Sequence, residues 1–164
     1  MNDVVESLEK RNEDTLRGRY LTFQIGAETF GIQIRYVTEI VSMRPLMVMP
    51  EMPEYIKGII NLRGKIISVM DMRLRFGIPW KEYNDRTCII VVEMDGISVG
   101  LIIDAVSEVV SINDDQVEKR PVMSAKTGCE YISNLGRKGN QVILLIDCEE
   151  LLSNDDVNLV SNFN

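Results

Sequence analysis

Four carboxylates lie in or beside apolar runs of this sequence and could do acid–base chemistry: Asp71, Glu93, Asp95 and Asp104. Two carboxyl groups held close together can act as a general acid and a general base. The spacing of these four fixes no such geometry, and acidic residues near turns are usually solvated or hydrogen-bonded there. The chain also has no histidine, which is the commonest general base. The sequence therefore favours a protein without catalysis.

Motifs that hold phosphates, metals or nucleophiles are also missing. The sequence has no G-x-S-x-G, no Walker-type loop, no G-x-G-x-x-G and no calcium loop of the EF-hand type. Cys88, Cys129 and Cys148 are widely spaced and have no histidine to complete a zinc site. We expect Cys88 and Cys148, which lie in apolar strings, to be reduced core residues, and Cys129 to be exposed. No cofactor is expected.

Arg63 offers a different chemistry, the recognition of another protein. It stands with Gly64 between the apolar runs 58–62 and 65–70, where an unpaired guanidinium cannot easily be buried. A rigid hairpin would present the planar fork of Arg63 to a carboxylate at little cost in entropy. A solvated hairpin tip would explain the same residues. Arg63 therefore faces water, a carboxylate or a partner, and the residues alone leave these three open.

Methionines and prolines crowd the segment that precedes this hairpin. Pro45, Pro50 and Pro53 prevent a regular element there and predict an extended connector. Thioether side chains adapt to partner surfaces, but they fill protein cores just as readily. Both interpretations stay open for the four methionines of the segment, Met43, Met47, Met49 and Met52.

The bulk numbers bound the class of protein. With 164 residues, 45% of them hydrophobic and 26% charged, the chain is typical of a soluble globular protein. A net charge of −7 argues against binding to nucleic acid or to an anionic membrane surface, since both attract clustered Lys and Arg. No run reaches the roughly 20 apolar residues of a membrane span, and no signal peptide opens the chain. We expect a cytoplasmic protein without membrane insertion.

Alternating apolar residues predict short strands joined by tight turns. Four hairpins are expected, with turns at 26–29, 63–64 and 95–96 and a glycine-rich turn within 130–147. Asp71 is expected to cap a short helix at 72–76, whereas 35–43 could be helix or strand. Because hairpins recur without the spacing of β-α-β units, the fold is expected to be mainly antiparallel β, as barrels or a sandwich. Residues 1–18 are expected to form a flexible tail.

Four stretches together resemble the CheW family of bacterial chemotaxis coupling proteins: "FGIQIRYVTEI", "IKGIINLRGKIISVMDMRLRFG", "YNDRTCIIVVEMDGISVGLIIDAVSEVVSI" and "EYISNLGRKGNQVILLIDCEELL". The resemblance extends from about Tyr20 to Leu152. It implies a single domain over 19–152, with a tail at 153–164. It also implies two five-stranded, SH3-like antiparallel β-barrels around a shared hydrophobic core, with short helices. From the two cycles of hairpins, we expect the barrels at about 19–80 and 84–148.

The same resemblance implies a non-catalytic adaptor. Such a protein joins the cytoplasmic tips of chemoreceptors to the regulatory domain of the histidine kinase CheA and helps to build rings with it. Whether the adaptor also forms rings by itself stays open. Two alternatives remain: a scaffold of the same fold in another receptor–kinase motility pathway, and a small β-barrel ligand binder that uses the carboxylates.

Individual residues match positions of functional weight in the family. Arg63 matches a sensitive arginine, and Glu39 matches an acidic residue near it, its expected salt-bridge partner. Cys88 and Met123 fall where the family makes a second contact with the kinase. The resemblance implies five positions for contact with receptor or kinase: Glu39, Gly58, Arg63, Gly100 and Val109. It does not say which partner Arg63 and Glu39 touch.

Overall fold

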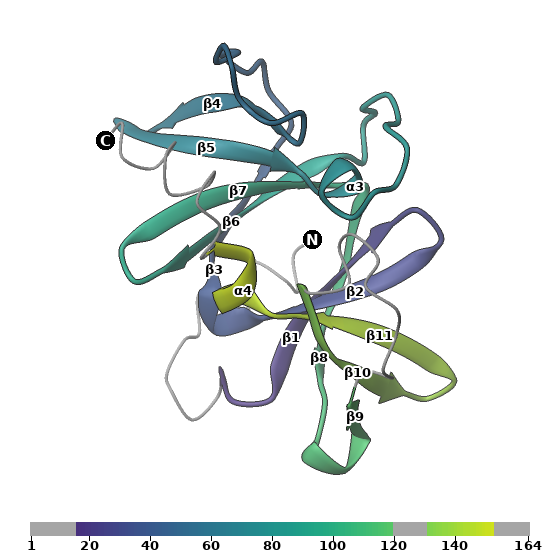
Figure 1. Ribbon diagram of the computed structural model, residues 1–164. Coiled ribbons are helices and arrows are strands. Elements are labelled where there is room, and N and C mark those ends of the chain that lie inside the picture. The colour runs from purple at the N-terminus through teal and green to yellow at the C-terminus, as the bar shows by residue number, and fades with distance from the viewer. Residues whose placement is uncertain (1–15, 120–130, 153–164) are drawn as a thin grey trace.

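Two β-sheets dominate the computed structural model, which describes residues 16–119 and 131–152. The five-stranded sheet, in the upper half of Figure 1, has the order β3-β6-β7-β5-β4: β3 Val37–Ser42, β6 Cys88–Met94, β7 Ile97–Ile103, β5 Lys65–Asp71 and β4 Ile56–Leu62. The six-stranded sheet has the order β8-β1-β2-β11-β10-β9: β8 Ala105–Ser111, β1 Arg19–Ile25, β2 Glu28–Gln33, β11 Gln141–Ile146, β10 Ile132–Lys138 and β9 Val117–Lys119. The mainly β prediction is confirmed.

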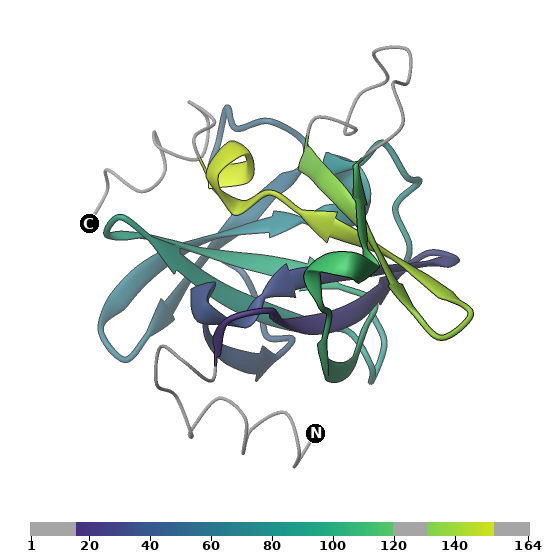
Figure 2. The same ribbon diagram turned by 90° about the horizontal axis from the view of Figure 1, so that it is seen from below.

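Short helices complete the described part of the chain. These are η1 (Ile34–Tyr36), α3 (Met72–Arg75), η2 (Asp114–Gln116) and α4 (Cys148–Leu152). The ambiguous segment 35–43 contains both alternatives, because it starts in η1 and continues as β3. Figure 2, seen from below, shows the teal strands of the five-stranded sheet beside the green and yellow strands of the six-stranded one.

The sheets do not follow the expected division of the barrels at 19–80 and 84–148. Each sheet takes strands from both halves. The halves are joined by two parallel pairs, β5 with β7 and β2 with β11, and by two antiparallel pairs, β3 with β6 and β1 with β8. The apolar alternation predicts a strand but not its neighbour, so this mixing of the two halves could not be predicted from the sequence. One sheet also has six strands instead of five, because the three-residue β9 is added at its edge.

Local turn chemistry produces the hairpins at the expected places. Arg63 and Gly64 have φ values of 53° and 85°, and Asp95 and Gly96 have 53° and 80°. Two successive positive φ values are what a two-residue type I′ turn requires. The Asp71 carboxylate caps α3 as predicted, because it accepts hydrogen bonds from the backbone N–H groups of the first turn at 2.9 and 3.3 Å.

The hydrophobic core has a shared centre and two separate parts. The largest cluster joins residues of both sheets, such as Phe23 and Leu101. A second cluster belongs to the five-stranded sheet and a third to the six-stranded sheet and the residue that follows β8. Cys88 and Cys148 are buried free thiols, as predicted, and burial raises their pKa values to about 11 and about 12. Cys129 lies outside the described residues.

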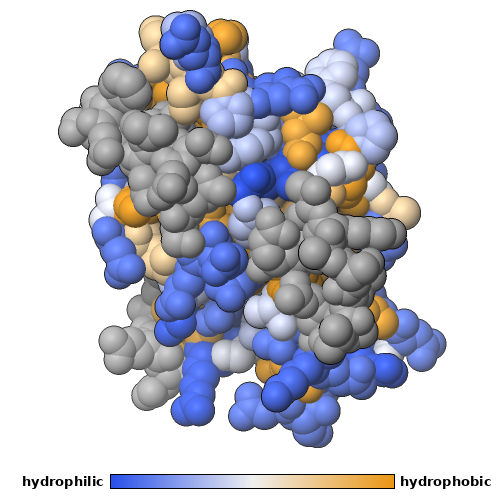
Figure 3. All heavy atoms as spheres, in the orientation of Figure 1, coloured by the Kyte–Doolittle hydropathy of each residue, from blue (hydrophilic) through white to orange (hydrophobic). Residues whose placement is uncertain are grey.

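The segment before β4 is an extended connector, as its prolines predict. It pairs with β4 once, through two backbone hydrogen bonds of 3.0 and 2.9 Å between Met47 and Ile59. Met43 and Met52 pack against the core, whereas Met47 and Val48 are 67% and 77% exposed. Figure 3 shows apolar residues at the top of the molecule, above β4. The methionines therefore divide between core and surface.

Candidate functional site

Arg63 and Glu39 form a two-pronged ion pair on the five-stranded sheet. The Nη1 and Nη2 atoms of Arg63 donate to the two carboxylate oxygens of Glu39 at 2.9 and 2.6 Å. Arg63 lies in the β4–β5 turn. A hydrogen bond of 2.8 Å from the Gly64 N–H to the Asn61 side chain stabilises this turn. The salt bridge expected between Arg63 and Glu39 is therefore present.

This ion pair is displayed to solvent. The Arg63 side chain is 75% exposed and the Glu39 side chain 22% exposed. The hydrogen bonds and the negative charge of Glu39 raise the pKa of Arg63, so the guanidinium stays charged. An exposed pair contributes little to stability, because water already solvates both charges. The arrangement is therefore suited to presenting an oriented charge rather than to holding the fold together.

Gly58 and Gly100 lie in the same row across this sheet as Glu39. Going from strand to strand, the row runs Glu39, Val91, Gly100, Val69 and Gly58. Residues aligned on neighbouring strands share one face of a sheet. Three of the five positions implied for contact with receptor or kinase are thus aligned across all five strands.

Both glycines are required by packing within the molecule. A Cβ atom on Gly58 would lie 2.4 Å from the backbone oxygen of Met47, and the φ of Gly58 is 153°. A Cβ atom on Gly100 would lie 2.8 Å from the Ile89 side chain. Gly58 therefore allows the connector to approach β4, and Gly100 allows the buried face of the sheet to close.

The remaining predicted site residues lie elsewhere. Val109 is in β8 of the six-stranded sheet, opposite Leu21, and is partly buried against the shared core. Cys88 begins β6 and, although buried, borders a surface pocket that also involves Ser42 and Val106. Met123 lies outside the described residues. The structure thus brings Glu39, Arg63, Gly58, Gly100 and Cys88 to the five-stranded sheet, but not Val109.

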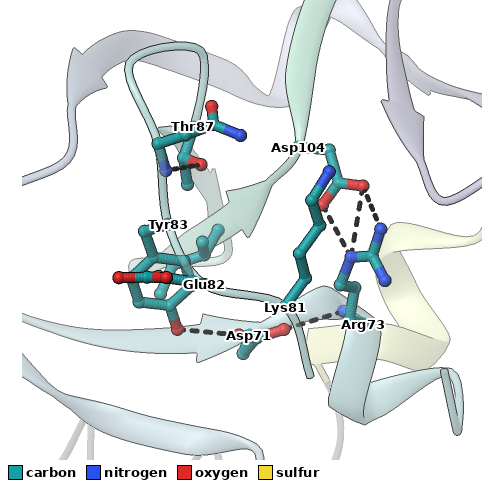
Figure 4. A pocket seen from close by; sticks show the side chains of 9 residues that line it. Asp71, Arg73, Lys81, Glu82, Tyr83, Thr87 and Asp104 are labelled. Atoms are coloured by element: carbon teal, nitrogen blue, oxygen red, sulfur yellow. Dashed lines mark hydrogen bonds and ion pairs between the residues drawn. The ribbon is translucent and has the colours of Figure 1, made fainter. Parts of the chain in front are cut away.

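Two of the four carboxylates considered for acid–base chemistry, Asp71 and Asp104, are engaged in structural contacts. Figure 4 shows Arg73 and Asp104 pointing toward each other, with contacts of 2.9, 3.2 and 2.6 Å. Burial acts to raise the pKa of Asp104, but hydrogen bonds from Arg73 and the Gly26 N–H outweigh it and hold that pKa below its usual value. Asp71 accepts a hydrogen bond of 2.7 Å from Tyr83 besides capping α3. Neither carboxylate is left to act as a catalytic acid or base.

A second arginine of α3 has a role that the sequence did not reveal. The Arg75 guanidinium stacks between the rings of Tyr55 and Tyr131, 4.2 and 4.4 Å from their centroids, and it donates to the Tyr131 hydroxyl. Tyr55 lies at the end of the connector, and Tyr131 lies just before β10. Because these three residues are far apart in the sequence, no local pattern indicates their contact.

Residues 16–119 and 131–152 contain no group of three or more Cys, Asp or Glu side chains arranged to hold a metal ion. None of their helices has the length and apolar character needed to cross a membrane.

Similarity to known proteins covers nearly the whole chain. Residues 19–156 match the family described as CheW-like domain. The chain is 34% identical to the chemotaxis protein CheW of Klebsiella aerogenes, covering 91% of this chain and 90% of that protein. It is 30% identical to the chemotaxis protein CheW of Treponema pallidum, with coverages of 87% and 86%.

A solved structure gives the same result for the fold. The crystal structure of the scaffolding protein TtCheW from Thermoanaerobacter tengcongensis matches with a TM-score of 0.78 at 34% identity, over 85% of this chain and 94% of that one. This similarity confirms the predicted fold of two SH3-like barrels around a shared core. The chain belongs to the CheW family of chemotaxis scaffold proteins.

Proposed function

We propose that this protein is a non-catalytic adaptor that joins a CheA-type histidine kinase to the cytoplasmic tips of chemoreceptors. It acts in the cytoplasm, at receptor arrays, by positioning its two partners. An adaptor of this kind transmits receptor state because its partners bind some arrangements of the assembly better than others. Family membership supports the scaffold role, and the Arg63–Glu39 pair carries the proposal for a contact site.

The geometry of that pair suits a protein interface. A guanidinium held by a turn and by a carboxylate has already lost much of its conformational freedom, so a partner orders little more on binding. Its exposed face can still bind a carboxylate of the partner, and an arginine fork does so in a fixed orientation. We assign Arg63 and Glu39 to a contact with the regulatory domain of the kinase.

The other predicted site residues either shape the five-stranded sheet or contact a partner elsewhere on the protein. Gly58 and Gly100 shape the five-stranded sheet beneath the contact, because side chains there would collide with Met47 and Ile89. Val109 contributes to receptor binding from the second sheet. Cys88, beside its surface pocket, and Met123 belong to a second contact with the kinase.

Calorimetric titration of the regulatory domain of a CheA-type kinase into this chain tests the proposal. We expect saturable binding that Arg63→Asp weakens at least tenfold, because the reversed charge repels the partner carboxylate. Arg137→Asp is the matched control: Arg137 is also exposed and pairs with Glu118 at 2.8 Å, but on the six-stranded sheet. Equal weakening by both variants, or no binding by the folded wild-type chain, would refute the kinase contact.

A further inference from the structure

A positively charged cavity lies away from the residues assigned above. It has a volume of about 610 Å³ and is lined by Leu16, Arg17, Gly18, Gln33 and Arg35. Leu16, Arg17 and Gly18 directly precede β1, whose purple start is visible in Figure 2. Gln33 is the last residue of β2, and Arg35 lies in η1. The cavity therefore belongs to the region where the first hairpin of the six-stranded sheet begins and ends.

Among residues 16–119 and 131–152, the lining carries positive charge only: Arg17 and Arg35 are its charged members there, and none of the lining residues described is a carboxylate. Within the part of the chain that the structure describes, the ion pairs involve other arginines, and neither Arg17 nor Arg35 has an acidic partner there. The protein as a whole carries a net charge of −7, with 25 acidic and 18 basic residues. A cavity with two guanidiniums that have no acidic partner among the described residues stands out against that background.

Arg35 is held in place by its neighbour. Its guanidinium stacks over the Tyr36 ring, 4.7 Å from the centroid, and donates to the Tyr36 hydroxyl at 2.7 Å. This contact orients the guanidinium through a hydrogen bond and ring stacking, and it is not an ion pair. Burial and the charge of Asp114 raise the pKa of Tyr20, and the charge of Arg35 acts in the opposite direction. Asp114 is not among the described residues that line the cavity.

Arg19 directly follows the lining residue Gly18 in the chain and adds a third positive charge. Its Nε atom is buried and has no hydrogen-bond partner among residues 16–119 and 131–152. A buried donor without a partner is costly, and a bound anion nearby reduces that cost. Arg137 is exposed and pairs with Glu118. Arg17, Arg19 and Arg35 have no such acidic partner among the described residues, so their positive charges add up at this end of β1.

We propose that this cavity binds an acidic peptide segment of a partner protein, through its glutamate or aspartate side chains. Two guanidinium forks bind carboxylates in pairs of parallel hydrogen bonds, and the Gln33 amide offers a further donor. A volume of about 610 Å³ accommodates several side chains, which is far more than one inorganic phosphate needs. This site is separate from the Arg63–Glu39 pair and does not depend on the function proposed above.

Titration of a fluorescein-labelled hexaglutamate peptide against the full chain, followed by fluorescence anisotropy, tests this site. We expect saturable binding that weakens with added salt, and about a tenfold loss of affinity in Arg17→Gln and in Arg35→Gln, the loss typical of one charge-assisted contact. Arg137→Gln removes the same charge from another surface and should leave affinity unchanged. An equal loss in all three variants would show non-specific attraction and overturn the proposal.

Two further measurements use the unaltered protein. Amide chemical-shift mapping with hexaglutamate should give its largest shifts at Gly18 and Gln33, and shifts centred elsewhere would overturn the site. Inorganic phosphate should compete with the peptide only at the level expected from ionic strength. If phosphate at low concentration displaces the peptide, the site is one for phosphate groups and the proposed peptide ligand is wrong.

Discussion

Arg63 and Glu39 come from opposite edges of the five-stranded sheet, yet two hydrogen bonds of 2.9 and 2.6 Å join them. Glu39 is in the edge strand β3, and Arg63 follows the other edge strand, β4. Two edges of a flat five-stranded sheet would be far apart, since neighbouring strands are about 4.8 Å from each other. The contact therefore requires the sheet to curl into a barrel, and it presents an oriented charge where the barrel closes.

Exchange of the two charges tests whether Arg63 and Glu39 act as a unit. Arg63→Asp alone places two carboxylates side by side, and Glu39→Arg alone places two guanidiniums together. We expect kinase binding to be weak in each single variant and partly restored in the double variant, because the ion pair forms again in the reverse direction. Thermal melting should show little loss in either single variant, since the pair is exposed. Additive losses of binding would mean that the residues act independently.

Gly58→Ala should destabilise the protein by about 2–4 kcal/mol, because the new Cβ atom meets the Met47 backbone oxygen and the φ of 153° is strained for alanine. Urea unfolding measures this loss. Hydrogen exchange at the Ile59 amide, which donates to Met47, should become faster as the connector moves away. Gly139→Ala is the control, because Gly139 also has a positive φ but open space around it. This variant should lower the free energy of unfolding by less than Gly58→Ala does. Equal losses would show that the close approach of the connector is unimportant.

Arg75→Ala should cost about 1–3 kcal/mol, because it removes the stacking on Tyr55 and Tyr131 and the hydrogen bond to the Tyr131 hydroxyl. Arg75→Lys should retain only part of the stability that Arg75→Ala loses, since an ammonium group is not planar and cannot stack on a ring as a guanidinium does. The free energy of unfolding in urea provides the measurement. Wild-type stability in Arg75→Ala would mean that the stacked arginine does not join the connector to the start of β10.

Asp104 should make stability fall at acid pH. The pKa of this carboxyl is lower in the folded protein than its ordinary value of 3.8, so the folded state binds its proton less well than the unfolded state. The contribution of Asp104 to the free energy of unfolding is present above about pH 4. It is lost as the pH falls through the pKa of Asp104 in the folded protein. Urea midpoints measured between neutral and acid pH should show a shallower decline in Asp104→Asn than in wild type. Identical slopes would assign the decline to other carboxylates.

The features that follow from local chemistry could be predicted from the sequence. The turns at Arg63-Gly64 and Asp95-Gly96 and the cap at Asp71 depend on residues adjacent in the chain. The Arg63–Glu39 salt bridge was expected only through resemblance to a family, because 24 residues separate the partners.

The features that depend on distant contacts could not be predicted. Parallel pairing of β5 with β7 and of β2 with β11 decides the composition of the sheets, and the alternation within a strand carries no information about it. The need for glycine at position 58 arises from the connector, and the role of Arg75 arises from Tyr131, 56 residues away. Such contacts depend on the completed packing of the chain.

Co-sedimentation of a CheA-type kinase with vesicles that carry chemoreceptors tests the adaptor role most directly. The kinase should sediment with the vesicles when this protein is added and stay in the supernatant without it. The Arg63→Asp variant should lose this effect, whereas Arg137→Asp should retain it. Kinase recruitment that is the same with and without this protein, under conditions where the protein is folded, would contradict the account.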